Sequence, residues 1–329
     1  MKNILITGGA GYIGSHITEI LIRKKFNVLI VDDLSTGYRR LINKRAKFYN
    51  LNINNFKKLK KIITQNKIDS VMHLAAKLDV NESQKKPKKY YNTNVRGTHT
   101  LIKACKDSEV RNFIFSSTAA VYKDKIFKVK ENSPTFPKSV YGKTKLKAEE
   151  MIKKSFSGKK TNYAILRYFN IVGASSSNKI GQINKYDLLF KNLSSSIIKK
   201  KPYIHIYGND YKTKDGTCIR DFIHVSDISN IHVQVLKKIN YTKKSLILNC
   251  GYGIGRTVLE VAKTFAKVSK KKLSIIYKPR RKADLEQITA DVTKLKKVLS
   301  WKPKFNSLSL MVKSCIKWEK LIKNTYVKN

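Results

Sequence analysis

A glycine-rich turn near the N-terminus constrains the fold more than any other feature of this sequence. The apolar run Asn3–Thr7 leads into Gly8-x-x-Gly11-x-x-Gly14, and an amphipathic stretch follows. Glycines at this spacing permit a tight turn, a close approach of the backbone to a pyrophosphate, and close packing of a helix on a strand. The N-terminus of that helix would present free N–H groups to the phosphates. The order of strand, glycine turn and helix therefore predicts the start of a dinucleotide-binding sheet.

Short apolar runs and longer amphipathic stretches alternate through the first 170 residues. This alternation is typical of a parallel sheet covered by helices on both faces, so we predict an α/β fold of the Rossmann type, doubly wound. The expected strands are Asn3–Thr7, Asn27–Val31, Ala46–Leu51, Ser70–Leu74, Asn112–Ser116 and Tyr163–Tyr168. The expected helices are Ile13–Lys24, Phe56–Gln65, Tyr90–Lys106 and Tyr141–Lys154.

The pattern loosens after Asn170, which predicts a smaller C-terminal lobe interleaved with the first domain. We place the division between residues 1–170 and 171–329, with some later segments returning to the first domain. The expected elements are a loop at Ala174–Asn178, strands at Tyr203–Tyr207 and Leu246–Cys250, and helices at Val258–Lys267 and Leu308–Lys323.

Two carboxylates follow the second predicted strand and indicate which dinucleotide is bound. Asp32 lies at the position from which a carboxylate accepts a hydrogen bond from the adenosine ribose 2′-hydroxyl. Asp32 and Asp33 would both repel a 2′-phosphate, so the sequence favours NAD over NADP. Arg39 and Arg40 are close enough in sequence to keep NADP open as an alternative.

A tyrosine and a lysine four residues apart form the candidate catalytic pair. Tyr141 and Lys145 share one face of a predicted helix. A nearby ammonium and a cationic nicotinamide should lower the pKa of the phenol, which would make it a general base near neutral pH. Thr118 ends the fifth predicted strand, at the edge where open α/β sheets bind ligands, and its hydroxyl could hydrogen-bond a substrate oxygen. We predict Thr118, Tyr141 and Lys145 as the catalytic residues.

Composition excludes several other classes of protein. No apolar run reaches the ~20 residues of a membrane helix, and the N-terminal run is too short for a signal peptide, so we expect a cytoplasmic protein without a membrane partner. The net charge of +47 raises the possibility of nucleic-acid binding. The basic residues are mostly lysines spread along the chain, whereas nucleic-acid sites tend to use arginine, so we expect no specific nucleic-acid partner. The four cysteines lack metal-ligand spacing, so we expect them reduced and no metal site.

The motifs taken together resemble those of the extended short-chain dehydrogenase/reductase family of NAD-dependent epimerases and dehydratases. These are Thr7–Gly14, Ser116–Thr118 and the Tyr141/Lys145 pair. Further stretches are similar to the UDP-hexose 4-epimerases of that family, namely Leu166–Asn170, Gly208–Tyr211 and Asp215–Val225. The resemblance runs from residue 1 to about Trp301. It implies a homodimer that interconverts UDP-glucose and UDP-galactose through a transient 4-keto intermediate with bound NAD, and a C-terminal lobe that mainly binds the UDP-sugar.

The resemblance also implies a set of contact residues. NAD would contact the glycine turn and the ends of the following strands, at Gly8, Gly11, Tyr12, Ile13, Gly14, Asp32, Asp33, Leu34, Ser35, Thr36, Gly37, Asn52, Ile53, Leu74, Ala75, Ala76, Lys77, Tyr141, Lys145 and Phe169. The UDP-sugar would contact Thr118, Asn170, Asn192, Leu193, Arg220, Arg281 and Asp284. The guanidinium fork of an arginine suits a diphosphate. Three positions depart from the family pattern. Asn52 replaces the usual Asp, Lys77 stands one residue before the usual lysine, and Thr93 replaces a usual Asn.

Several alternatives remain open at this point. The sugar could be a uronic acid, a pentose or an acetamido sugar, the reaction could be a net dehydrogenation, or the chain could be a non-catalytic basic protein that binds nucleotide or RNA. A dehydratase of the same family would carry Asp and Glu directly after the strand-end Thr. Here Ala119 and Ala120 follow Thr118, which predicts epimerisation without dehydration, although Asp124 and Glu131 lie further along the loop.

Overall fold

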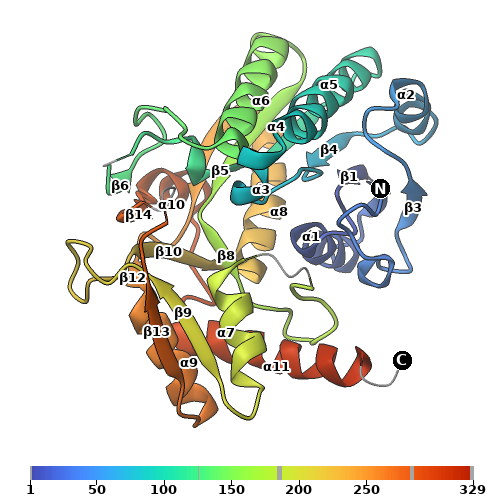
Figure 1. The fold of residues 1–329 in the computed structure, drawn as a ribbon. Helices are drawn as coiled ribbons and strands as arrows, with labels where there is room; N and C mark the ends of the chain where they lie inside the picture. The colour runs from blue at the N-terminus through green and yellow to red at the C-terminus, as the bar shows by residue number, and fades with distance from the viewer. Residues whose placement is uncertain (1, 125, 184–186, 282–284, 327–329) are drawn as a thin grey trace.

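A seven-stranded parallel sheet forms the larger half of the fold (Figure 1). The structure is a computed structural model that describes residues 2–124, 126–183, 187–281 and 285–326. The strand order is β11-β7-β5-β4-β1-β2-β3, and every neighbouring pair is parallel. The strands are β1 (Asn3–Thr7), β2 (Asn27–Asp32), β3 (Lys47–Asn50), β4 (Ser70–His73), β5 (Asn112–Thr118), β7 (Asn162–Tyr168) and β11 (Leu246–Cys250). The predicted fold class is confirmed.

Helices cover both faces of this sheet, as the apolar central strand requires. Successive side chains of a strand point to opposite faces. Ile4 and Ile6 of β1 join the core beneath α1 (Tyr12–Arg23) and α8 (Val225–Thr242). Leu5 joins the core beneath α2 (Phe56–Gln65), α5 (Gly97–Asp107) and α6 (Val140–Phe156). Because both faces are buried, β1 has an unbroken apolar run instead of alternating polarity.

The prediction of one continuous helix at Tyr90–Lys106 is wrong, because the helix is irregular near its start. The structure has α3 (Val80–Lys85), then α4 (Pro87–Tyr90), a π-helical turn at Tyr91–Arg96, and α5. The turn places buried Asn94 against the loop after β4, where its Oδ1 accepts from the Lys77 N–H at 2.8 Å and its Nδ2 donates to the Lys77 carbonyl at 3.0 Å. Local π-helical turns of this kind occur frequently at functional sites.

Smaller sheets and further helices form the rest of the fold. The second sheet has the order β12-β10-β14-β6, and β8 pairs with β10. Its strands are β6 (Lys128–Val129), β8 (Asn170–Val172), β10 (Ile219–His224), β12 (Gly255–Thr257) and β14 (Gln287–Ala290). A two-stranded sheet, the short helix α10 and three longer helices complete it, namely β9 (Tyr203–Tyr207), β13 (Ser274–Lys278), α10 (Thr293–Leu299), α7 (Leu189–Ile197), α9 (Val258–Ser269) and α11 (Leu308–Tyr326).

The two halves exchange segments. Strand β6 comes from the first half of the chain but belongs to the second sheet, whereas β11 comes from the second half and forms an edge of the large sheet. Helix α8 likewise packs beside α1 on the large sheet (Figure 1). Both sheets therefore depend on contacts between segments far apart in the sequence.

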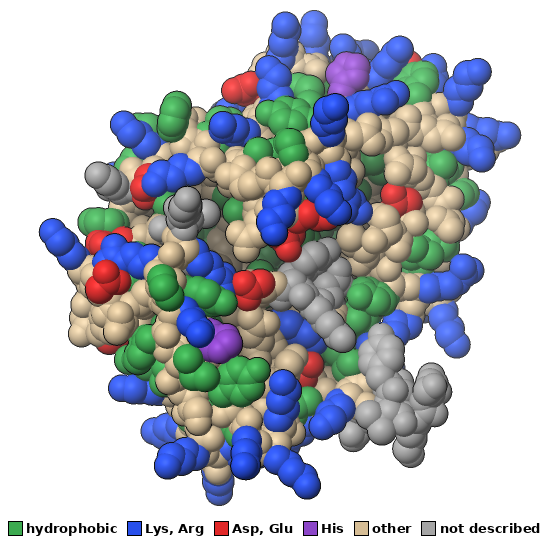
Figure 2. Space-filling view, in the orientation of Figure 1, with side chains coloured by type: hydrophobic (Ala, Val, Ile, Leu, Met, Phe, Trp, Pro, Cys, Tyr) green, Lys and Arg blue, Asp and Glu red, His purple; other side chains and the backbone are tan. Residues whose placement is uncertain are grey.

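The surface carries basic side chains over the whole face seen in Figure 2, and they are not gathered over one element. Over the described ranges, none of the helices is both long enough and apolar enough to span a bilayer.

Candidate active site

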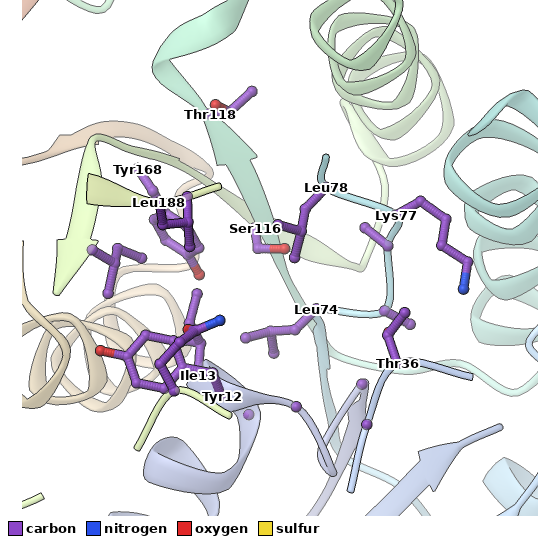
Figure 3. A pocket seen from close by; sticks show the side chains of 18 of the residues that line it. Tyr12, Ile13, Thr36, Leu74, Lys77, Leu78, Ser116, Thr118, Tyr168 and Leu188 are labelled. Atoms are coloured by element: carbon purple, nitrogen blue, oxygen red, sulfur yellow. The ribbon is translucent and has the colours of Figure 1, made fainter. Parts of the chain in front are cut away.

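A cavity of about 400 Å³ opens at the carboxyl edge of the large sheet. It is lined by residues at the ends of β1, β2, β4, β5 and β7 and by residues of α7 and α11 (Figure 3). The chain passes from β1 to β2 in one direction across the sheet and from β4 to β5 in the other, so the strand order reverses between β1 and β4. Ligands of open α/β sheets bind at such a switch point.

The glycine turn forms one wall of the cavity, and Gly8 and Gly14 cannot be replaced without a steric clash. Gly8 has a φ of +77°, and a Cβ there would lie 2.6 Å from the Ala75 nitrogen. A Cβ on Gly14 would lie 2.8 Å from the Gly9 Cα. Helix α1 begins at Tyr12, and no side chain caps the N–H groups of its first turn. The turn thus offers uncapped donors to an anion, as a pyrophosphate site requires.

The carboxylates after β2 stabilise the loops around the glycine turn. Asp32 is buried, and its two oxygens accept from the backbone N–H groups of Ala10 at 3.0 Å and Leu34 at 2.9 Å. Burial raises the pKa of Asp32, and these hydrogen bonds oppose the rise. Asp33 accepts from the Asn52 amide at 2.7 Å, which joins two of the positions predicted to contact the adenosine. Both carboxylates line the cavity, so a 2′-phosphate would meet two acidic groups there.

Arg39 and Arg40 lie over aromatic rings and do not line the cavity. These are the two residues that keep NADP open as an alternative in the sequence. The guanidinium of Arg39 is 5.8 Å from the centroid of the Phe48 ring, and that of Arg40 is 6.0 Å from the centroid of the Trp318 ring. This arrangement supports NAD over NADP.

Lys77 lies toward the adenosine end of the cavity. Its Nζ donates to the Ser35 hydroxyl at 2.9 Å, and Figure 3 shows its side chain extending toward Thr36 and away from Thr118. Burial lowers the pKa of Lys77, and the Asp33 carboxylate opposes this. Leu78, which the sequence argument did not assign, also lines the cavity. Lys77 is therefore badly placed to act beside the Tyr141/Lys145 pair.

Thr118, Tyr141 and Lys145 come together where β5 meets α6. The side chains of Thr118 and Tyr141 are hydrogen-bonded. The Lys145 ammonium donates to the Ser116 carbonyl at 2.7 Å and lies 4.7 Å from the centroid of the Phe115 ring. Ser139 caps α6 by accepting from the Gly142 N–H at 3.0 Å, which fixes the start of the helix that carries the pair. Tyr141 and Thr118 line the cavity, and Lys145 lies buried behind them.

The predicted lowering of the Tyr141 pKa is wrong as far as the side chains of this protein are concerned. Burial raises the pKa of the Tyr141 phenol to about 12, and the hydrogen bond with Thr118 only partly opposes this. Burial also lowers the pKa of Lys145 to about 7, although the Glu149 carboxylate favours its charged form. Desolvation, which the sequence does not report, acts on both side chains, since Lys145 is buried and Tyr141 is partly buried at the cavity wall.

This pKa predicts how Lys145 affects stability. In the unfolded chain Lys145 stays protonated up to about pH 10.4, whereas in the folded protein it loses its proton near pH 7. The unfolded state therefore binds more protons between these values, and stability should rise with pH in that window. Urea unfolding at about pH 7 and pH 9 should show this rise in the wild type and a smaller one in Lys145→Met. Equal pH dependence in the two proteins would mean that Lys145 is not desolvated.

The predicted NAD contacts line the cavity with two exceptions. Lys145 is one, and the other is Leu34, whose backbone N–H bonds to Asp32. Phe169 lines the cavity, as do Thr118 and Asn170 among the predicted UDP-sugar contacts.

Four other predicted UDP-sugar contacts do not line the cavity. Leu193 is fully buried in the core, and the Asn192 amide donates to Asp187 at 2.7 Å. Arg220 Nη1 donates to the Ile219 carbonyl at 2.9 Å. Arg281 pairs with Asp187 at 2.8 Å and lies 3.7 Å from the centroid of the Tyr207 ring. Asp284, the remaining prediction, lies outside the described residues.

Helix α7 presents other residues to the cavity. Its N-cap and cavity-facing side are Leu188, Leu189, Phe190, Lys191 and Ser194. The core position of Leu193 sets the rotation of the helix. Each residue turns the helix by about 100°, so residues one and two positions from Leu193 point in other directions than Leu193 does.

Helix α11 contributes a wall that no sequence motif indicated. Cys315, Trp318 and Glu319 line the cavity, so Cys315 is more than a core residue. Glu319 pairs with Lys191 at 2.6 Å, and both side chains are nearly buried. The Trp318 indole donates to the Gln182 carbonyl at 2.9 Å. The sequence showed only an amphipathic helix here.

Comparisons with known proteins agree on one family. The profile of the NAD-dependent epimerase/dehydratase family matches residues 4–251. The UDP-glucose 4-epimerase of Lactobacillus helveticus is 39% identical over 96% of this chain and 97% of its own length. A UDP-glucose 4-epimerase structure from Stenotrophomonas maltophila, with bound NAD and formylated UDP-arabinopyranose, superposes with a TM-score of 0.95 at 32% identity, covering 99% of this chain and 100% of that one. The UDP-Glc/GlcNAc 4-epimerase of Campylobacter jejuni gives a TM-score of 0.86 at 38% identity, covering 98% and 100%.

Proposed function

Because this chain belongs to the NAD-dependent epimerase/dehydratase family and is an NAD-dependent nucleotide-sugar 4-epimerase, we propose that its substrates are UDP-glucose and UDP-galactose. The two sugars would interconvert through a transient 4-keto intermediate. One observation carries the proposal: the Tyr141/Lys145 pair and Thr118 meet in the same cavity as the glycine turn.

NAD is the cofactor, and the described residues fit it. The uncapped first turn of α1 suits the pyrophosphate, and Asp32 and Asp33 suit an adenosine without a 2′-phosphate. We assign the adenosine end to the carboxylates with Ser35, Asn52 and Ile53, and the nicotinamide end to Phe169 and the catalytic residues. When bound, NAD supplies reversible hydride exchange with C4 of the sugar.

The side chains of this chain then manage the proton. Tyr141 takes the proton of the 4-hydroxyl and returns it to the same oxygen after the sugar has turned over. Thr118, already bonded to Tyr141, holds the reacting oxygen near the phenol. The charged form of Lys145 stabilises the phenolate, and its attraction is strengthened because Lys145 is buried.

Relatives with different sugars define the alternatives. One similar structure holds a UDP-pentose derivative, and another similar enzyme takes both UDP-Glc and UDP-GlcNAc. Purified enzyme should be assayed with UDP-galactose, UDP-N-acetylgalactosamine, UDP-arabinose and UDP-galacturonic acid. We expect the highest kcat/KM with UDP-galactose. A higher value with any other sugar would replace the proposed substrate without touching the reaction type.

Incubation with UDP-glucose should give no 4-keto-6-deoxy sugar. Loss of the 6-hydroxyl needs a general acid, and the residues after Thr118 are Ala119 and Ala120. The two acids further along the loop are engaged elsewhere, since Asp124 pairs with Lys138 and Glu131 accepts from the Asn249 N–H at 2.9 Å. Mass spectrometry of the products tests this. A product that has lost one water would show that an acid reaches C6.

We also propose that the enzyme is a cytoplasmic homodimer without a specific nucleic-acid or membrane partner, and that residue 170 divides a cofactor domain from a UDP-sugar lobe. Light scattering on the purified protein tests the dimer. The family resemblance supports the dimer, and the spread of lysines supports the absence of a nucleic-acid site.

A further inference from the structure

A buried ion pair lies directly behind the catalytic pair. Glu149 follows Lys145 by one turn of α6 and is fully buried. Arg167 of β7 is also buried and donates two hydrogen bonds to the Glu149 carboxylate, from Nη2 to Oε2 at 2.7 Å and from Nε to Oε1 at 3.0 Å. This bidentate geometry restrains both the distance and the orientation of the two side chains.

The ion pair extends to the strand that carries Thr118. The Ser117 hydroxyl donates to Oε1 of Glu149, and Ser117 is the neighbour of Thr118 on β5. The remaining donor of Arg167, Nη1, reaches the Tyr122 hydroxyl at 3.0 Å and the Glu131 carbonyl at 2.9 Å. Glu149 therefore joins α6 to β5 and β7, which are neighbouring parallel strands.

Building on the proposed function, we propose that Glu149 is a positioning residue of the catalytic site. Through Ser117 and Arg167 it holds α6 against β5 at the separation at which Tyr141 meets Thr118. Tyr141 and Lys145 are on α6, whereas Thr118 is on β5, so a shift between the two elements would break the constellation. Stability alone does not explain a buried ion pair, because well-packed apolar side chains of similar volume are often as stabilising.

The charge of Glu149 also acts on Lys145. The titratable groups around Glu149 are Arg167 from β7, Tyr122 and Glu131 from the segment after β5, and Lys145 from α6. His73 of β4 also faces Lys145, and burial lowers the pKa of His73 to about 3, so it stays neutral. Glu149 is then the group that favours the charged form of Lys145. Its removal should lower the pKa of Lys145 further and move the alkaline limb of the kcat profile to lower pH.

The cleanest test removes one hydroxyl and keeps the ion pair. In the NAD-loaded enzyme, Ser117→Ala should lower kcat about tenfold or more, because small misplacement of reacting groups is costly, with the KM for UDP-galactose within about twofold of wild type. Ser117→Thr keeps the hydroxyl on a strand that tolerates β-branched residues, and should recover most of kcat. Ser229→Ala is the matched control, since it removes another buried serine hydroxyl, bonded to the Val225 carbonyl in α8, and should leave kcat unchanged.

The pH profile of kcat in Glu149→Gln supplies the second test. Arg167→Lys serves as a comparison, because it keeps a positive charge beside Glu149 but changes the shape of the cation. The proposal predicts a lower kcat and an alkaline limb shifted to lower pH in Glu149→Gln. If Glu149→Gln does not fold, Ser117→Ala decides. Wild-type kcat in Ser117→Ala would overturn the inference, as would an unshifted profile in folded Glu149→Gln. An inactive wild-type enzyme would instead contradict the proposed function, so the two failures are distinguishable.

Discussion

Tyr141→Phe should lower kcat by about 10²- to 10⁴-fold, the usual worth of a general base, while fold and NAD binding persist. The phenol is bonded to Thr118 and is the proton acceptor that shares a helix face with Lys145. Its pKa of about 12 means that phenolate is scarce until positive charge lies beside it. The variant cannot form that phenolate at all, so the remaining rate should depend little on pH.

The measurement is steady-state turnover of UDP-galactose, with NAD content followed by absorbance after denaturation. Tyr90→Phe is the control, because it removes a buried tyrosine hydroxyl that bonds to Glu82 at 3.0 Å outside the cavity. It should keep wild-type turnover. Near-normal turnover in Tyr141→Phe would remove Tyr141 from the chemistry and leave the proton without an acceptor in this account.

Asp221→Asn should destabilise the protein by about 2–4 kcal/mol, because it leaves buried donors without acceptors. Asp221 lies on β10 with no exposed surface. Its Oδ1 accepts from the Tyr252 N–H at 2.9 Å, and its Oδ2 accepts from the N–H groups of Gly253 at 2.8 Å and Ala290 at 3.1 Å. In either orientation the asparagine NH₂ would face an N–H donor. The carboxylate thus joins β10, the turn after β11 and β14.

Urea unfolding of the two proteins measures this loss. Asp107→Asn is the control, since Asp107 makes an exposed ion pair with Lys60 at 3.3 Å and should change stability by less than about 0.5 kcal/mol. Equal stability of Asp221→Asn and wild type would show that the three backbone donors find other partners.

The first half of the fold could be predicted because its signals are local. The strand β1 and helix α2 have the expected bounds, since an apolar run and an amphipathic period each follow from which faces are buried. Tyr141 and Lys145 could be placed on one helix face from their spacing alone. The break in the helix near Asn94 could not, because it comes with hydrogen bonds to Lys77 on a distant loop.

The second half depended on tertiary contacts that spacing does not report. The direction in which Asn192 and Leu193 point is set by the packing of α7, and Leu193 points into the core. The cavity wall from α11 includes the contact of Glu319 with Lys191, a pair separated by 128 residues. The Tyr141 pKa was mispredicted for a similar reason, since burial is a property of the folded chain.

The central claim is that the enzyme oxidises C4 of the sugar transiently and then returns the hydride to the same carbon. Purified enzyme, with no NAD added, should be incubated with UDP-galactose while NMR follows the anomeric signals and absorbance follows NADH. We predict conversion to UDP-glucose until the two sugars reach equilibrium, over many turnovers per enzyme, without accumulation of NADH beyond the enzyme concentration. Unchanged UDP-galactose in NAD-loaded enzyme, or NADH formed in proportion to a 4-keto product, would contradict the account.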